Sequence, residues 1–395
     1  MPTVITTSSS LDDVVAEASA ADRYAIDTEF HRERTYYPKV ALVQLGWADQ
    51  VVLIDPLQVD LSAMAKLLDG PGTCILHAGI QDLEVLDLNT GTIPSEIFDT
   101  QIAAGFLGLA TSSLASLLDH FMSIKLPKGD RLTDWLRRPL TDDQLRYAAS
   151  DVQYLITLAD LIEEGLREAG RMEWAVEESN IVRERPRNRR NPDEAVLRIK
   201  EARSLKGASF KAATALAAWR ERTAAKRDVP VRQVLADLGV VAVSQQMPKT
   251  VDQLRGLRGV EGRHLKGTAG QEILDAVAKG VGGENPGPRV GRSPELPRHL
   301  RPVVSLVTAW IAQLSRDNRI DPALLATRAD VEAALRGDSE VRILHGWRSD
   351  MVGDPIAQLV SGDAAVGFDG DGRLVLEKRS RIPLEPRMPN SGVVD

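Results

Sequence analysis

Two segments of this 395-residue chain carry no pattern of a packed helix or strand, and they divide it into three modules. Residues 181–194 hold five arginines and two prolines without apolar periodicity, which is typical of an exposed linker. Residues 282–298 are dense in glycine and proline and form the second break. The sequence therefore predicts three domains, over 1–180, 195–281 and 299–385, followed by a tail at 386–395.

The first module mixes short β-branched segments with helical patterns. Strands are predicted at 24–30, 40–45, 51–55 and 74–78. Three strands come in succession before helices and strands mix, which does not fit a doubly wound parallel sheet. We therefore expect an α/β domain with a mixed sheet flanked by helices, one of them a long helical stretch over 141–169.

The second and third modules are predicted to be small and all-α. Apolar residues recur at helical spacing throughout 195–281 and in several short runs after residue 299. Residues 365–376 differ, because an Asp-Gly-Asp-Gly turn there lies between alternating apolar residues, as in a β-hairpin.

Charge is distributed unevenly among the modules. The net charge of −7 for the whole chain, taken alone, disfavours nucleic acid as a partner. Residues 1–180 carry 13 basic and 29 acidic side chains, whereas residues 195–281 carry 16 basic and 8 acidic ones. This asymmetry indicates phosphate contacts by the second module, with solvated helix faces as the alternative for part of the set. The candidate residues are Arg198, Lys200, Arg203, Lys206, Lys211, Arg220, Arg222, Lys226 and Arg227.

Cysteine content and hydropathy point to a cytoplasmic protein. The single cysteine, Cys74, excludes an intrachain disulfide and a cysteine-rich zinc site, and it indicates a reducing compartment. The N-terminal residues lack a basic region followed by an apolar one, and no run of about 18 apolar residues occurs. We expect a soluble protein without a membrane segment.

A pair of carboxylates interrupts the first long predicted strand. Side chains two apart on a strand share a face, so Asp27 and Glu29 project together while Thr28 and Phe30 point the other way. Two adjacent carboxylates repel each other unless a cation lies between them, and Mg²⁺ or Mn²⁺ is the natural candidate. The alternative is an edge position, where Glu29 faces solvent and Asp27 caps a turn.

Two further segments carry candidate acids. Asp82 lies in the first turn of a predicted helix, where a carboxylate also interacts favourably with the helix N-terminus. Tyr147 and Asp151 are four residues apart on another predicted helix and share one face; a half-buried tyrosine and a solvated acid are the alternative. His77, inside an apolar strand, is interpreted as a structural histidine.

In order and spacing, these elements resemble the exonuclease motifs of the DEDD superfamily, in the variant with a tyrosine in its third motif. The match is closest to bacterial ribonuclease D, through Asp27-Thr-Glu-Phe30, Leu76-His-Ala-Gly79, Asp82-Leu-Glu-Val85 and Arg138-Pro-Leu-Thr141. Residues 195–281 are similar to an HRDC domain, notably at Arg227-Asp-Val-Pro230 and Met247-Pro248. The third module resembles a second, divergent HRDC unit through Leu324-Leu-Ala-Thr-Arg328 and Leu344-His-Gly-Trp-Arg348.

The resemblance implies an RNase H-like exonuclease domain followed by two HRDC-type domains. It implies two Mg²⁺ or Mn²⁺ ions for in-line hydrolysis of the 3′-terminal phosphodiester, bound by Asp27, Glu29, Asp82 and Asp151. Tyr147 would orient the attacking water. Thr28 and Phe30 are candidates to contact the terminal nucleotide, with a core position for Phe30 as the alternative.

The function expected from the resemblance is that of a monomeric 3′→5′ exoribonuclease releasing nucleoside 5′-monophosphates. Its expected substrates are tRNA precursors and other small structured RNAs with a free 3′ end. A 3′→5′ DNA exonuclease and a catalytically silent RNA-binding scaffold are the alternatives. The scaffold predicts that at least one of the five motif residues is missing, but Asp27, Glu29, Asp82, Tyr147 and Asp151 are all present.

Overall fold

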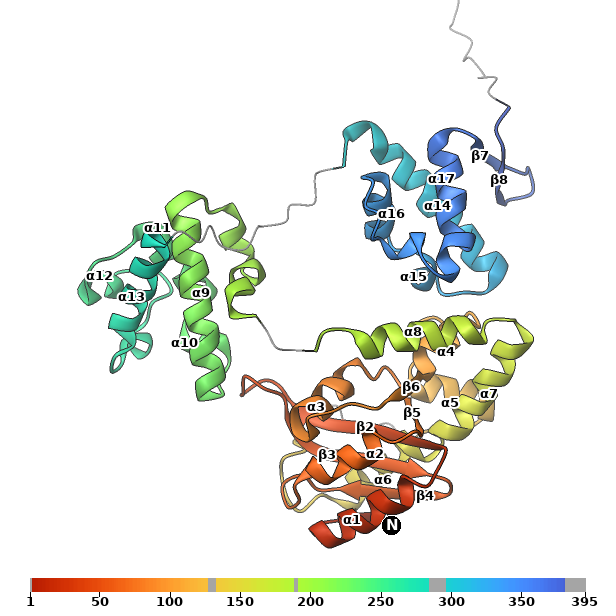
Figure 1. Ribbon diagram of the computed structural model, residues 1–395, viewed down its shortest axis with the longest axis horizontal. Helices are drawn as coiled ribbons and strands as arrows, with labels where there is room; N and C mark the ends of the chain where they lie inside the picture. Colours follow the sequence, from red (N-terminus) through yellow and green to blue (C-terminus); the bar gives the residue numbers. More distant parts are fainter. Residues whose placement is uncertain (1, 127–132, 188–190, 284–295, 381–395) are drawn as a thin grey trace, which may run out of the picture. The chain divides into compact units, whose positions relative to one another are not determined.

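The computed structural model of the chain describes residues 2–126, 133–187, 191–283 and 296–380, and Figure 1 shows their helices and strands. The chain divides into two compact units. The first contains Met1–Ala103 and Ser113–Ser293, and the second contains Ala104–Ser112 and Pro294–Asp395. The predicted tail at 386–395 and most of the second predicted linker lie outside the described residues.

A six-stranded mixed sheet, in the order β1-β4-β3-β2-β5-β6, forms the centre of the first module. Strands β2, β3 and β4 pair antiparallel, whereas β1 with β4 and β5 with β2 and β6 pair in parallel. The predicted mixed sheet is therefore confirmed, although the sequence missed β1 and β6, which are only three and four residues long. The strands are β1 Thr3–Ile5, β2 Arg23–His31, β3 Lys39–Trp47, β4 Gln50–Ile54, β5 Thr73–Leu76 and β6 Glu96–Asp99.

Helices cover both faces of the sheet. On one face, α1 (Ser8–Ala18), α2 (Ala65–Leu68) and α3 (Ile80–Thr90) share an apolar core with β2 and β3. On the other face, Ala148 and Ala149 of α6 (Asp142–Gln153) pack with Leu42 and Leu53 of the sheet. The two core clusters pack the two faces of the sheet, so the sheet is a rigid support for the side chains that it carries.

The long helical stretch predicted over 141–169 is two helices. Tyr154, with φ −111° and ψ 1°, separates α6 from α7 (Leu155–Glu168). The apolar periodicity continues across this break, which is why the sequence pattern did not show it. After α7, α8 (Met172–Glu184) extends four residues into the segment predicted as a linker. The remaining helices of this module are α4 (Thr100–Gly105) and α5 (Leu114–Met122).

Helices are the only regular secondary structure among the described residues of the second module, as predicted. Its core joins Leu216 of the longest helix to Val240, Val243 and Ile273. The α-helices are α9 Gly207–Arg227, α10 Val231–Val234, α11 Asp237–Gln246, α12 Val251–Arg255 and α13 Ala269–Gly282. Among the described residues of the whole chain, none of the helices combines the length and the apolar composition needed to cross a bilayer.

The third module contains four α-helices and a hairpin within its described residues. Strands β7 (Ala364–Phe368) and β8 (Leu374–Lys378) pair antiparallel around the Asp-Gly-Asp-Gly turn. The predicted hairpin is confirmed, and the all-α prediction for this module is wrong because the alternating apolar residues form paired strands. The helices are α14 Arg301–Asn318, α15 Pro322–Leu325, α16 Arg328–Leu335 and α17 Asp354–Ser361.

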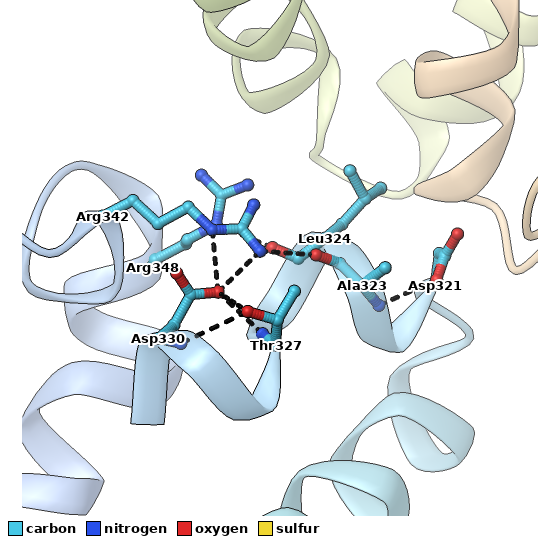
Figure 2. Close-up of polar contacts among 7 residues, drawn as sticks. All are labelled: Asp321, Ala323, Leu324, Thr327, Asp330, Arg342 and Arg348. Carbon is cyan, nitrogen blue, oxygen red and sulfur yellow. Dashed lines mark hydrogen bonds and ion pairs between the residues drawn. The ribbon is translucent and has the colours of Figure 1, made fainter. Parts of the chain in front are cut away.

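Two arginines hold the short helices of this module together. Arg342 binds the Asp330 carboxylate and the Ala323 carbonyl, the latter at 2.7 Å, and Nε of Arg348 donates to the Leu324 carbonyl at 2.6 Å (Figure 2).

Residues Ala104–Ser112 belong to the same compact unit as the third module. The backbone N–H of Asp321 donates to the Gly105 carbonyl at 2.8 Å, and the rings of Phe106 and Trp347 meet edge to face.

Candidate active site

Three of the predicted acids meet where α6 covers β2. Asp27 and Glu29 lie on β2 and Asp151 lies on α6, and one carboxylate oxygen from each lies within 4.8 Å of the others. Ala25 of β2 pairs with Gly46, where an added Cβ would lie 3.3 Å from the carbonyl oxygen of Val152. Gly46 therefore lets α6 approach the sheet, and the alternation along β2 turns Asp27 and Glu29 to the face that α6 covers.

Asp82 reaches the same site from α3. Its Oδ1 accepts hydrogen bonds from the backbone N–H of Thr28 at 3.1 Å and from the Thr28 hydroxyl at 2.5 Å. Thr28 thus points away from Asp27, as alternation requires, and fixes Asp82 to β2. Asp82 lies outside the group of three, but its charge raises the pKa of Asp27, Glu29 and Asp151. Four carboxylates therefore share one electrostatic site.

Burial raises the pKa of every one of these acids, and repulsion from neighbouring carboxylates adds to it, from within the group for Asp27, Glu29 and Asp151 and from Asp99 for Asp82. Burial, then Asp151 and Asp82, raises the pKa of Glu29 to about 8. Burial, then Asp82, raises the pKa of Asp151 to about 7. Burial raises the pKa of Asp82 to about 6 against the hydrogen bonds from Thr28, and it raises that of Asp27 well above its ordinary value.

The composition of this site suits a divalent cation. Among the described residues, the groups that shift these four pKa values include no basic side chain. Carboxylates gathered without a protein counter-charge are the ligands that Mg²⁺ and Mn²⁺ prefer. The alternative in which Glu29 faces solvent is wrong, because its carboxylate lies in this group and is only partly accessible.

Tyr147 lies one turn before Asp151 on α6, as the spacing predicts. The Tyr147 side chain is partly buried and packs with the core beneath α6. Its ring is tilted by 31° from that of Trp135, and the two ring centroids are 6.1 Å apart. The tyrosine and the acid therefore lie one turn apart on the sheet side of α6, with Tyr147 beside Trp135 and Asp151 beside the acids of β2.

Phe30 and His77 have local packing partners. Phe30 packs against the apolar core, and the guanidinium carbon of Arg32 lies 5.0 Å from its ring centroid. This agrees with the core position weighed for Phe30, and a contact of Phe30 with the nucleotide stays a prediction. Nδ1 of His77 lies 3.0 Å from the Thr100 hydroxyl oxygen, which is a partner of the kind expected for a structural histidine.

One residue beside the acids was missed by sequence reasoning. Gln44 lies directly opposite Asp27 in the β2–β3 pairing and is fully buried. Neither its amide nitrogen nor its amide oxygen has a hydrogen-bond partner among the described residues. The strand register places Gln44 there, and the sequence signal that could have found it is a polar residue inside an otherwise apolar strand.

The basic set predicted on the second module needs one correction. Arg220 is only 3% exposed and donates to the Asp237 carboxylate at 2.6 Å and to the Leu235 carbonyl at 3.1 Å, so it is not available to phosphate. Burial of an arginine requires such partners, and the sequence pattern does not show them. The exposed members of the set are Arg198, Lys200, Arg203, Lys206, Arg222, Lys226 and Arg227.

Known proteins resemble this chain along most of its length. A sequence model of 3′-5′ exonuclease domains matches residues 2–167, and a model of the HRDC domain matches residues 209–277. Ribonuclease D of Gluconacetobacter diazotrophicus is 33% identical over 375 residues, which cover 93% of this chain and 95% of that protein. For ribonuclease D of Cronobacter turicensis the identity is 33% over 370 residues, covering 90% and 99%.

The structural comparison agrees with the sequence comparison. The crystal structure of Escherichia coli RNase D matches with a TM-score of 0.81 and 30% sequence identity. The match covers 92% of this chain and 99% of that one. The chain belongs to the ribonuclease D family.

Proposed function

We propose that the chain, a 3′→5′ exoribonuclease of the ribonuclease D family, uses two divalent ions, Mg²⁺ or Mn²⁺, held by Asp27, Glu29, Asp82 and Asp151. The observation that carries this proposal is the group of carboxylate oxygens within 4.8 Å on β2 and α6, with Asp82 beside it. When bound, such ions stabilise the charge on the attacking and leaving oxygens of an in-line displacement.

The chain's own residues would hold and orient the reactants. Burial comes first and the neighbouring carboxylates second in raising the pKa values of Glu29 and Asp151, so a bound cation would offset an unfavourable environment that the fold imposes on the ionised acids. Tyr147 would orient the attacking water through its hydroxyl. A tyrosine, with an ordinary pKa of about 10, is a poor general base at neutral pH, so we assign Tyr147 a positioning role. Thr28 and Phe30 would lie beside the terminal nucleotide.

The proposed substrates are tRNA precursors and other small structured RNAs with a free 3′ end, cut to nucleoside 5′-monophosphates. The Escherichia coli structure is that of an exoribonuclease involved in structured RNA processing, which supports this choice. Exposed basic residues on the second module would bind RNA phosphates without reading sequence. We also propose that the protein is a cytoplasmic monomer and that residues 299–385 form a divergent HRDC-type domain, with domain limits near 180, 195 and 281.

The test is digestion of an immature tRNA in Mg²⁺ or Mn²⁺ by the full chain and by Asp27→Asn. We expect Asp27→Asn to lower the rate at least about 10²-fold, because it removes one of the charges that hold the ions. The control is Asp22→Asn, an isosteric change at an exposed acid near the start of β2. Labelling each end of the RNA shows which end is shortened and so checks the direction of digestion. Identifying the released product checks that it is a nucleoside 5′-monophosphate.

Three outcomes would contradict the proposal. Metal-dependent digestion retained by Asp27→Asn would overturn the assignment of the acids. A preference for DNA when labelled RNA and DNA compete would favour a DNA exonuclease. RNA binding without digestion by the unmodified chain would favour the silent scaffold.

A further inference from the structure

Arg138 and Asp55 form a bidentate ion pair at the end of β4. Nε of Arg138 donates to Oδ2 of Asp55 and Nη2 donates to Oδ1, each at 2.7 Å. Asp55 is 2% exposed and also accepts hydrogen bonds from the backbone N–H of Leu57 and the amide of Gln58. Burial acts to raise the pKa of Asp55, but the hydrogen bonds from Arg138, Leu57 and Gln58 and the charge of Arg138 together lower it below its ordinary value.

The other donors of Arg138 hold two stretches of backbone. Nη2 donates to the carbonyl of Ala41 in β3, and Nη1 donates to the carbonyl of Trp135, both at 2.7 Å. One guanidinium therefore connects three parts of the chain: the residue after β4, the first part of β3 and the segment around Trp135. A lysine cannot do this, because an ammonium lacks the planar fork of donors.

Trp135 connects Arg138 with α6, because its side chain packs against that helix. Its indole is 7% exposed and packs with Leu53 of β4 and Ala148 of α6. The ring of Tyr147 lies against it at a centroid separation of 6.1 Å. Fixing the Trp135 carbonyl therefore fixes the surface on which the Tyr147 ring rests.

We propose that Arg138, together with Asp55, is a positioning residue that sets the orientation of Tyr147 through Trp135. The inference rests on the proposed role of Tyr147 in orienting the attacking water. A buried ion pair is by itself weak evidence for stability, because apolar residues of similar volume often stabilise a fold as well. The hydrogen bonds from Arg138 to Asp55, Ala41 and Trp135 instead fit a role in fixing the position of a catalytic side chain. A displacement of about 1 Å at a reacting group can lower the rate about 10²-fold.

The test is a double-mutant cycle in the full chain. We measure kcat and KM on a 3′-hydroxyl RNA for the unmodified protein, Arg138→Lys, Tyr147→Phe and the double variant. The matched control is Arg137→Lys, because Arg137 is the neighbouring residue and its side chain is exposed. Thermal unfolding of each variant shows whether it is folded at the assay temperature.

We expect Arg138→Lys to lower kcat about tenfold with KM nearly unchanged, and Arg137→Lys to leave both unchanged. In the Tyr147→Phe background, Arg138→Lys should lower kcat by less than about twofold, because the group it positions is already gone. If Arg138→Lys is unfolded under assay conditions, Asp55→Asn replaces it in the same cycle, with the same criteria.

If Arg138→Lys lowers kcat equally in the unmodified protein and in Tyr147→Phe, Arg138 does not act through Tyr147, and the inference is overturned. An unchanged kcat in Arg138→Lys would overturn it as well. An unchanged kcat in Tyr147→Phe would instead remove the proposed role of Tyr147, and the inference with it. The effect of Asp27→Asn is independent of these results and tests the metal site alone.

Discussion

Thr28 contacts the candidate active site although its side chain points away from the strand face that carries Asp27. Its hydroxyl and its backbone N–H both donate to the same oxygen of Asp82. These bonds favour the ionised carboxylate and lower its pKa, but burial has the larger effect, and the balance is a pKa of about 6. A threonine between two acids is therefore more than a spacer, because it keeps a third acid ionised at neutral pH.

Replacing Thr28 with valine should shift the pH dependence of the enzyme. Valine keeps the shape but removes the hydroxyl donor, so the pKa of Asp82 should rise further above its ordinary value. The acidic limb of the kcat/KM profile should move to higher pH at saturating Mg²⁺, and a profile measured from pH 5 to 9 checks this. Thr92→Val is the control, because Thr92 donates a similar bond to Asp69. An acidic limb that stays in place would contradict the prediction.

At the scale of elements, three of them deliver the acids: β2, α3 and α6. Each folded-state pKa lies above its unfolded value, so ionisation of these groups opposes folding. The stabilisation from the protonated forms is complete below pH about 4 and is lost as pH rises through the folded values of about 6 to 8. Without a cation, the elements repel one another at neutral pH.

The exonuclease domain should therefore unfold at a lower temperature at pH 8 than at pH 5 when divalent ions are removed with EDTA. Mg²⁺ should restore stability at pH 8 and have little effect at pH 5, because protonated carboxylates do not bind it. Thermal unfolding with and without Mg²⁺ checks this. In EDTA, the unfolding temperature of Asp27→Asn should depend less on pH than that of the unmodified protein. An equal change of unfolding temperature with pH in the two proteins would contradict the electrostatic explanation.

The sequence predicted the elements that carry long patterns and missed those that do not. Strands β2, β3 and β4 were found because several residues alternate or are β-branched, and the pairing of Asp27 with Glu29 followed from the strand period alone. Edge strands of three or four residues are too short for such a signal. The bond from Thr28 to Asp82 and the fork from Arg138 to Asp55 join residues 54 and 83 positions apart, which local patterns do not contain.

For the whole molecule, the charge asymmetry read from the sequence makes a measurable prediction. Lys200, Arg203 and Lys206 are exposed on the basic second module. Changing all three to glutamine should weaken RNA binding at low salt and flatten the dependence of log K on log salt concentration, because fewer counterions are released. Binding titrations from about 50 to 200 mM salt check this.

The control for this prediction is a pair of changes on the first module, Lys66→Gln with Arg167→Gln, since both side chains are exposed there. The control should lower affinity less per charge removed. Equal effects per charge would mean that RNA responds to net charge rather than to the second module.

The sequence predicted only in part which basic residues are exposed to RNA, because the burial of Arg220 depends on its ion pair with Asp237.

The grouping of Ala104–Ser112 with the last hundred residues has a consequence for biosynthesis. Phe106 is 0% exposed and rests on Trp347, which the ribosome makes 241 residues later. At about 5–20 residues per second, that interval is roughly 10–50 s. During synthesis the Phe106 ring is therefore without its aromatic partner for that time, and a chaperone that shields short apolar segments could bind it in this interval.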